Sequence, residues 1–234
     1  MDKNTILPVC GKLTEQFKQM DYFQILLFGA SNTERFVPLL YWTDVFECGL
    51  RMVCDRKFHL INSGLCGCTT AQALERFDRY VGQFRSQAVI VTLGGNDCRP
   101  EPGVFVDNTA FSANLAAIAA EIRKLGAEPI FQTYYQMDLD NMDPERAKNF
   151  VRNMELVRQS AADNNVLLVD QMSFFDRIPR DILRYKLLRD PYHLSETGNA
   201  LMGIILLKHF GIDPLIIEHH EKLLPALEIL QKYC

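Results

Sequence analysis

Phe23-Gln24-Ile25-Leu26-Leu27-Phe28-Gly29-Ala30-Ser31 is a nearly continuous apolar run that ends in two small residues and a hydroxyl group. An apolar run without alternation is typical of a β-strand covered on both faces, as in a parallel sheet with helices on either side. Four further short apolar runs lie at residues 58–61, 88–93, 129–134 and 166–169, and most of them are also nearly continuous in apolar residues. The sequence therefore predicts five strands, most of them covered on both faces.

Segments with the spacing of amphipathic helices separate these runs, at residues 71–84, 110–125 and 144–162. Strands that alternate with helices imply right-handed crossovers and a parallel sheet. We therefore expect an α/β protein, a three-layer α/β/α sandwich with a five-stranded parallel sheet in the flavodoxin-like order 2-1-3-4-5. Nothing in the middle of the chain is typical of a linker, which favours a single domain over residues 1–234.

The composition is that of an ordinary globular protein. Apolar residues make up 48% of the chain and charged residues 23%. The net charge is -4 and the basic residues are scattered, which argues against nucleic acid as a partner. The first apolar stretch ends at Pro8 and is too short for a signal peptide or a membrane span. We expect a cytoplasmic protein with no membrane insertion.

The seven cysteines form an odd set without a Cys-x-x-Cys pair, which favours free thiols in a reducing compartment. Cys66-Gly67-Cys68 could bind a metal ion. No second pair with metal-ligand spacing accompanies it, so two small side chains in a tight loop are the favoured interpretation. We expect neither a metal nor an organic cofactor.

Polar groups follow three of the predicted strands. Ser31 follows the first run, Gly64 the second and Asn96 the third. In an α/β sheet, ligands bind beyond the carboxyl ends of the strands, so these residues are expected to meet at one crevice. They offer a hydroxyl group, a backbone N–H and a side-chain amide, which are groups that acyl transfer requires.

Each of these residues also has an ordinary structural interpretation. Ser31 and Glu34 have the spacing of a capping box, which would begin a helix at Ser31 and place its dipole beside the hydroxyl group. Gly64 and the stretch Gly94-Gly95-Asn96-Asp97 are typical of tight turns. Ser31, Gly64 and Asn96 together indicate a functional site, although none of them does so alone.

His193 differs from the other four histidines because a carboxylate, Asp190, precedes it by three residues. In a helical turn this spacing puts both side chains on one side, so Asp190 can orient the imidazole while the second ring nitrogen faces the crevice. Alternatively, Asp190 and Ser195 are turn and cap residues that lead into a helix near residues 196–209. Residues 213–233 are expected to form an amphipathic helix with a break near Pro225.

In these motifs the sequence resembles the SGNH hydrolases, also called GDSL-type esterases and lipases. Ser31 matches the family's nucleophile block, Gly64 in Asn-x-Gly-x-x-Gly-x-Thr the second block, Asn96 in Gly-Gly-Asn-Asp the third, and Asp190-x-x-His193 the last. The resemblance implies a catalytic triad of Ser31, His193 and Asp190. It also implies an oxyanion hole formed by Ser31, Gly64 and Asn96.

The resemblance further implies a serine esterase or acylhydrolase that acts on a small-molecule ester. No segment has the length and apolarity of a lipase lid, so short-acyl, acetyl-type esters are expected, with residues 98–108 and 136–144 as specificity loops. One alternative is a thioesterase or lysophospholipase acting on longer acyl chains. Another is a non-enzymatic flavodoxin-like binding module, although glycine-rich phosphate-binding motifs are absent.

Two features lie outside this pattern. The chain has Ala30 where the family usually has an aspartate before the nucleophile. That aspartate would tie the nucleophile loop by local hydrogen bonds, but it is not itself a catalytic group. The segment at residues 213–233 could pack on the domain or against a second copy, so a homo-oligomer is possible.

Overall fold

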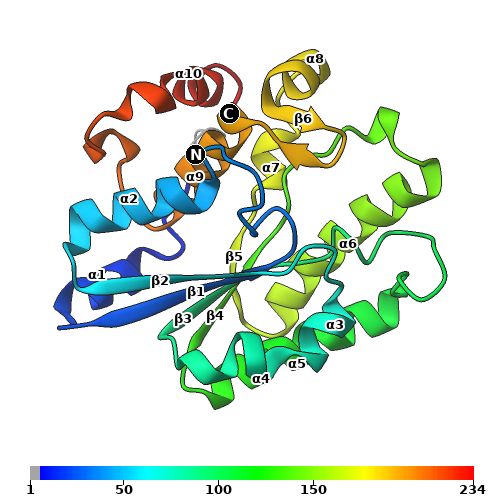
Figure 1. The fold of residues 1–234 in the computed structure, drawn as a ribbon, viewed down its shortest axis with the longest axis horizontal. Coiled ribbons are helices and arrows are strands. Elements are labelled where there is room, and N and C mark those ends of the chain that lie inside the picture. The colour runs from blue at the N-terminus through cyan, green and yellow to red at the C-terminus, as the bar shows by residue number, and fades with distance from the viewer. Residues whose placement is uncertain (1–5) are drawn as a thin grey trace.

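The computed structural model describes residues 6–234. The central sheet has five parallel strands in the order β2-β1-β3-β4-β5 (Figure 1). The strands are β1 (Phe23–Gly29), β2 (Phe58–Gly64), β3 (Ala88–Thr92), β4 (Glu128–Gln132) and β5 (Leu167–Val169). The predicted number, direction and order of the strands are confirmed.

The register of the sheet aligns the ends of its central strands. Gly29 of β1 lies opposite Gly64 of β2 and Thr92 of β3. Because all three strands run in the same direction, the segments that follow them leave the sheet side by side. The residues after β1, β2 and β3 therefore share one edge, as the sequence predicts.

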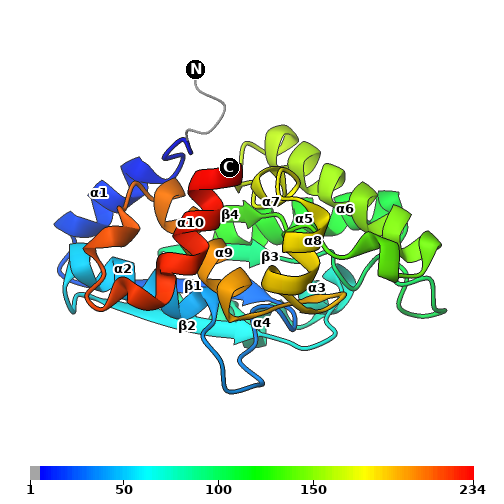
Figure 2. The ribbon, with the colours of Figure 1, turned by 90° about the horizontal axis from the view of Figure 1, so that it is seen from above.

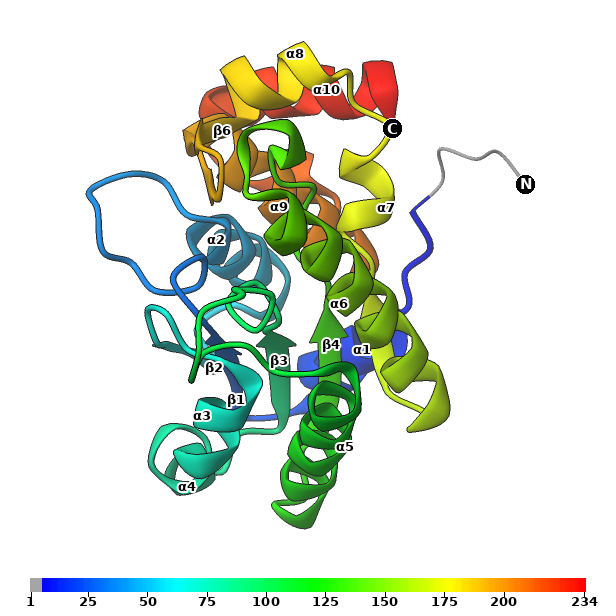
Figure 3. The same cartoon turned by 90° about the vertical axis from the view of Figure 1, so that its right-hand side faces the viewer.

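Helices cover both faces of the sheet (Figure 3). On one face α2 (Trp42–Cys54) contacts α1 (Gly11–Gln19) and packs on α9 (Glu196–His209), which also contacts α10 (Leu224–Tyr233). On the other face α5 (Asn108–Lys124) lies between α3 (Thr70–Glu75) and α6 (Pro144–Asp163). Residues 198–207 of α9 are all buried, which explains why this helix is apolar on nearly every side.

Side-chain caps fix where the longer helices begin. Asp107 caps α5, Asp143 caps α6 and Ser195 caps α9, each by accepting a hydrogen bond from a backbone N–H of the first turn. The helices predicted at residues 110–125, 144–162 and 196–209 are confirmed to within two residues at each end. No helix within residues 6–234 combines the length and the apolar composition that crossing a membrane requires.

The helix predicted at residues 71–84 is wrong in extent. The segment forms α3, then α4 (Phe77–Tyr80), then the 3-10 turn η1 (Gly82–Phe84). Arg76 and Val81 adopt dihedral angles outside the α-helical range and divide the segment at these two points.

The helix predicted at residues 213–233 is also shorter than expected. Two 3-10 turns, η4 (Pro214–Ile216) and η5 (His220–Leu223), precede α10. Pro225 lies in the first turn of α10, where its missing N–H costs no hydrogen bond. It therefore begins this helix and does not break a longer one.

A short antiparallel hairpin that the sequence did not predict lies near the carboxyl ends of the strands (Figure 1). It consists of β6 (Leu188–Asp190) and β7 (His193–Leu194). The connection from β5 runs through α7 (Met172–Phe175), α8 (Arg180–Ile182) and the π-helical turn η3 (Leu183–Leu187). Both residues of the predicted Asp190-His193 pair belong to this hairpin.

Candidate active site

Ser31 and His193 meet although 162 residues separate them in the chain. The Ser31 Oγ lies 3.2 Å from the His193 Nε2. The His193 side chain is about a quarter exposed, so both groups are open to a ligand. A serine hydroxyl at this distance donates to a neutral imidazole whose Nε2 carries no proton.

Asp190 fixes the other side of the imidazole. The His193 Nδ1 lies 2.8 Å from the Asp190 Oδ2 and 2.9 Å from its Oδ1. The same Oδ1 accepts the backbone N–H groups of Tyr192 at 2.8 Å and His193 at 2.9 Å. A carboxylate cannot donate, so Nδ1 carries the ring proton and leaves Nε2 free to accept from Ser31.

The structural basis of this pair differs from the expected one. Asp190 and His193 lie directly opposite each other in the β6/β7 hairpin, not on one side of a helical turn. Cross-strand neighbours in an antiparallel hairpin are close enough for their side chains to touch. The hairpin therefore brings the two groups together by strand pairing.

No helix begins at Ser31. The N–H groups of Thr33 and Glu34 both bond to the Ala30 carbonyl, at 2.9 and 3.0 Å, and form a single turn, while α2 begins only at Trp42. The capping box expected for Ser31 and Glu34 is wrong, and so is the helix dipole expected beside the hydroxyl. Within residues 6–234, the Ser31 N–H has no hydrogen-bond partner and can donate to a ligand.

A buried network connects the Ser31 turn to the hairpin. The Asn32 Nδ2 donates to the Tyr192 carbonyl at 3.3 Å, and the Asn32 carbonyl accepts from the Trp42 indole at 2.7 Å. The Tyr135 hydroxyl lies 2.6 Å from the Asn32 Oδ1 and 2.7 Å from the Tyr192 carbonyl, and donates to one of them. Burial raises the pKa of Tyr135, which therefore remains a donor. Tyr135 is a packed residue that positions the site.

Gly64 is not among the residues that line the pocket beside Ser31 and His193. It is the last residue of β2, and its N–H donates to the Asn62 Oδ1 at 3.0 Å. A Cβ atom at this position would lie 2.3 Å from the Glu34 nitrogen, so the glycine is needed because the Ser31 turn packs directly on it. The motif glycine thus has a packing role, and its expected position as an oxyanion donor does not agree with the structure.

Asn96 lies where the sequence predicts, in the segment after β3. Its Nδ2 donates to the Cys68 carbonyl at 3.1 Å, which uses one of the two amide hydrogens and leaves the other for a ligand. The glycines before it make room for aromatic rings. A Cβ on Gly94 or on Gly95 would approach the ring of Phe111 or Tyr134, respectively, to 2.9 Å.

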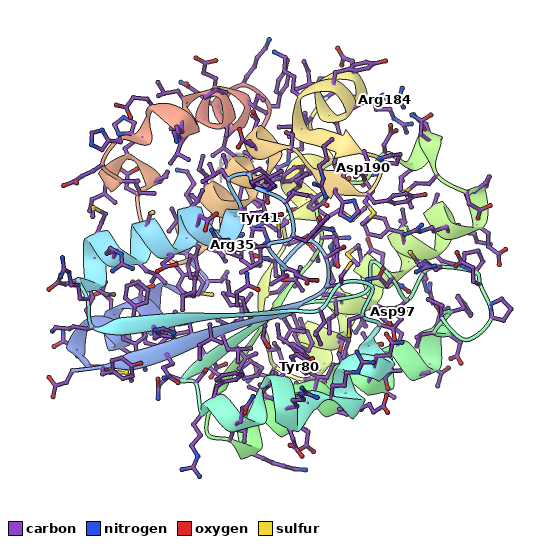
Figure 4. All side chains as sticks on the ribbon, viewed as in Figure 1. Arg35, Tyr41, Tyr80, Asp97, Arg184 and Asp190 are labelled. Atoms are coloured by element: carbon purple, nitrogen blue, oxygen red, sulfur yellow. The ribbon has the colours of Figure 1, made fainter. Side chains whose placement is uncertain are left out.

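Asp97 is fully buried next to Asn96 and anchors the start of α3. Its Oδ1 accepts from the Thr70 N–H at 2.8 Å and from the Thr70 hydroxyl. Burial raises the pKa of this carboxyl group, and its Oδ2 has no hydrogen-bond partner within residues 6–234. Asp97 and Asp190 lie at the same end of the sheet (Figure 4).

The segment between β1 and α2 projects from the body of the molecule (Figure 2) and places Phe36 beside His193. The two ring centroids are 5.9 Å apart in an edge-to-face arrangement, and the Phe36 side chain is 47% exposed. The ion pair between Arg35 and Asp44, at 3.0 Å, fixes this segment to α2. Phe36 therefore forms an apolar wall next to the imidazole.

A small pocket of about 70 Å³ connects these groups. Its lining includes Ser31, Asn96 and His193, the residues predicted to react or to stabilise charge. It also includes Arg146, whose Cζ lies 4.0 Å from the centroid of the Tyr192 ring. Sequence reasoning missed Arg146, because nothing in the motifs marks the first turn of α6 as part of the site.

The cysteines show no metal site. Cys66 is exposed and Cys68 is buried, with its thiol donating to the Thr69 carbonyl. Burial raises the pKa of Cys68 to about 11, so it is a protonated thiol at neutral pH. Within residues 6–234, no group of three or more histidine, cysteine, aspartate or glutamate side chains is arranged to hold a metal ion.

Comparison with known proteins identifies the family of this chain. The sequence pattern of the GDSL-like Lipase/Acylhydrolase family matches residues 27–201, which include the Ser31 turn and the hairpin. An acetylxylan esterase from Geobacillus stearothermophilus is 23% identical over 175 residues, which cover 71% of this chain and 75% of that protein.

Solved structures have the same fold. A catalytic mutant of an acetylxylan esterase from Geobacillus stearothermophilus matches with a TM-score of 0.69 and 20% identity, covering 83% of this chain and 98% of that one. A lipase/acylhydrolase from Enterococcus faecalis matches with a TM-score of 0.69 and 23% identity, covering 82% and 98%. The chain belongs to the GDSL-like Lipase/Acylhydrolase family and is a carboxylic ester hydrolase.

Proposed function

We propose that this enzyme hydrolyses short-acyl esters with Ser31 as nucleophile, His193 as general base and acid, and Asp190 as the group that orients His193. The observation that carries the proposal is the chain of contacts from the Ser31 Oγ to the His193 Nε2, at 3.2 Å, and from the Nδ1 to Asp190, at 2.8 Å. These distances are within reach of proton transfer in a serine hydrolase.

In the first step the Ser31 Oγ attacks the ester carbonyl while the His193 Nε2 takes the hydroxyl proton. The tetrahedral intermediate collapses, the carbon–oxygen bond to the alcohol breaks, and His193 returns the proton to the leaving alcohol. Water then attacks the acyl-serine, His193 takes its proton, and Ser31 is regenerated as the acid leaves. Asp190 stabilises the imidazolium that forms in both halves of the reaction.

Three donors would stabilise the oxyanion: the Ser31 N–H, the free Nδ2 hydrogen of Asn96, and a backbone N–H from the loop between β2 and α3. For the third we propose Gly67 in place of Gly64. Within residues 6–234 the Gly67 N–H has no hydrogen-bond partner, its φ is +74°, and its α-carbon faces open space. The bond from Asn96 to the Cys68 carbonyl holds this loop beside the pocket.

The size of the pocket supports a short acyl group. The pocket volume of about 70 Å³ is small and suits an acetyl group better than a long acyl chain. Tyr134, which is 1% exposed, and the buried side chain of Met137 line the pocket. The relatives named as acetylxylan esterases support acetyl esters as the substrate class.

The test is hydrolysis of 4-nitrophenyl esters from acetyl to decanoyl by the unchanged enzyme, by Ser31→Ala and by Ser112→Ala. Ser112 lies on α5, outside the pocket, and serves as the matched control. We expect maximal turnover with acetyl to butyryl esters, a loss of roughly 10⁴–10⁶ in kcat for Ser31→Ala, and no loss for the control. Activity retained by Ser31→Ala would refute the nucleophile, and a maximum at decanoyl would favour the longer-chain alternative.

A further inference from the structure

We propose that Arg146 binds a carboxylate or similar oxyanion of the substrate, so that the preferred esters carry a negative charge close to the scissile bond. The inference rests on the proposed function, because it assigns a substrate class to the same pocket. It names a residue that the family motifs do not contain.

Arg146 is positioned by α6 and by Tyr192. Its backbone N–H bonds to the helix cap Asp143 at 2.9 Å, which fixes the first turn of α6. Its side chain lines the pocket together with Ser31 and His193, and its Cζ lies 4.0 Å from the Tyr192 ring centroid. A guanidinium stacked on a ring keeps its N–H groups in its own plane, where they can bind a planar carboxylate in a bidentate manner.

The charge of Arg146 has no carboxylate partner within 4.0 Å among residues 6–234. Other arginines around the site are paired. Arg184 lies 2.7 Å from Asp138, and Arg99 lies 3.3 Å from Glu101. An arginine left without a carboxylate in a reactive pocket is therefore the exception in this neighbourhood.

The Arg146 Nε is also buried and has no hydrogen-bond partner within residues 6–234. A buried donor without an acceptor is unfavourable, and such groups in native proteins usually await a water molecule or a ligand. An oxyanion in the pocket would satisfy the guanidinium and neutralise its charge.

The acidic groups around Arg146 have partners of their own. Glu101, which interacts electrostatically with Arg146, pairs with Arg99 at 3.3 Å. The nearby Cys98 is a neutral thiol at neutral pH, since burial raises its pKa despite the guanidinium. Asp190 is engaged by His193 and by Arg189, whose Nε lies 3.6 Å from the Asp190 Oδ2. The Asp97 carboxyl group is buried and accepts a hydrogen bond from the Thr70 N–H, and burial raises its pKa. The pocket therefore attracts anions.

The test compares two pairs of esters that differ in one charge. In the first pair the charge is on the acyl part: mono-4-nitrophenyl succinate against 4-nitrophenyl butyrate. In the second it is on the alcohol part: acetoxyacetate against acetoxyacetamide, with released acetate measured. The readout is the ratio of kcat/KM for the charged ester to kcat/KM for the neutral one, in the unchanged enzyme, Arg146→Gln, Arg146→Lys and Arg152→Gln.

Arg152 is the matched control because it lies exposed on the same helix and does not line the pocket. In the unchanged enzyme we expect a ratio above one for at least one pair, and that pair tells which part of the substrate carries the anion. Arg146→Gln should lower the ratio roughly tenfold to hundredfold, Arg146→Lys should restore part of it, and Arg152→Gln should leave it unchanged. Added salt should reduce the ratio in the unchanged enzyme.

Ratios at or below one for both pairs, or equal ratios for Arg146→Gln and Arg152→Gln, would overturn the inference. A binding measurement separates this outcome from failure of the proposed function. In a Ser31→Ala background, calorimetry with acetoxyacetate should show binding that Arg146→Gln weakens at least tenfold. If no ester is turned over at all, the proposed function fails, and this titration still decides whether Arg146 binds the anion.

Discussion

The Glu34 carboxylate accepts a hydrogen bond from the Cys66 N–H at 2.6 Å, and this contact joins the turn that carries Ser31 to the loop between β2 and α3. The nucleophile and the proposed Gly67 donor lie on these two segments. This charge-assisted hydrogen bond helps to fix their relative position, together with the bond from the Leu65 N–H to the Gly29 carbonyl at 2.9 Å and the bond from the Asn62 Nδ2 to the Thr33 carbonyl at 2.7 Å.

Replacing Glu34 should loosen this connection. We expect Glu34→Ala to lower the free energy of unfolding by about 1–2 kcal/mol and kcat by about tenfold, because the two segments lose one of the hydrogen bonds that join them. Glu34→Gln, which keeps an acceptor oxygen, should retain most of both. Urea denaturation and ester turnover measure the two effects. Glu47→Ala is the control, because it removes only an exposed ion pair with Arg51. An equal loss of stability and of kcat in this variant would contradict the role given to Glu34.

Asp190→Asn should lower kcat by roughly 10³–10⁴ with little change in folding. The Asp190 Oδ1 accepts two backbone N–H groups, so the amide oxygen would keep that place and the amide NH₂ would face the His193 Nδ1. The imidazole would then carry its proton on Nε2 and could not accept from Ser31. Turnover and circular dichroism test this. A variant that is folded and fully active would show that Asp190 does not set the tautomer.

Asn96→Ala should lower kcat by roughly 10²–10³ with a much smaller change in KM, because an oxyanion donor acts mainly on charge that appears in the transition state. The side chain also holds the Cys68 carbonyl, so the melting temperature is measured on the same variant. Asn114→Ala is the control for a loss of local stability near α3, because it removes a hydrogen bond to the Thr70 hydroxyl. A rise in KM at constant kcat would make Asn96 a substrate-binding residue.

Asp97 should make stability depend on pH. Its pKa is raised by burial in the folded protein, so the folded state holds the proton more tightly than the unfolded chain, whose pKa is about 3.9. Stability contributed by this group is present below that value and is lost as the pH rises through the folded pKa. We therefore expect the free energy of unfolding of Asp97→Asn, measured with urea between pH 4 and pH 7, to rise with pH relative to that of the unchanged protein. A difference that is constant with pH would contradict this account.

The sheet could be predicted from the sequence because most of its strands are nearly continuous apolar runs separated by helical segments, a pattern typical of a parallel sheet covered on both faces. The helices at residues 110–125, 144–162 and 196–209 could be predicted from their periodicity, and Ser195 marks the start of the last one. The division of residues 71–84 into three short elements could not be predicted from the sequence. The spacing of apolar residues continues through Arg76 and Val81, but the backbone at these two residues leaves the helical conformation.

The site was predictable only in part. The ends of parallel strands place Ser31 and Asn96 at one edge, and the short spacing of Asp190 and His193 points to a contact. The local structure behind that contact is a hairpin of very short strands, which carries no periodic signal. The position of Gly64 depends on the Asn62 side chain that takes its N–H, and the position of Arg146 depends on the packing of α6 against Tyr192. Neither contact leaves a pattern in the sequence.

The assignment of Ser31 as nucleophile can be tested by mapping a covalent label. The unchanged enzyme is treated with a fluorophosphonate, digested, and analysed by mass spectrometry. The account predicts one modified peptide with the phosphonyl group on Ser31, and no modification of Ser31→Ala or of enzyme whose His193 has been replaced by alanine. A label on another residue, or the same label on Ser31→Ala, would contradict it.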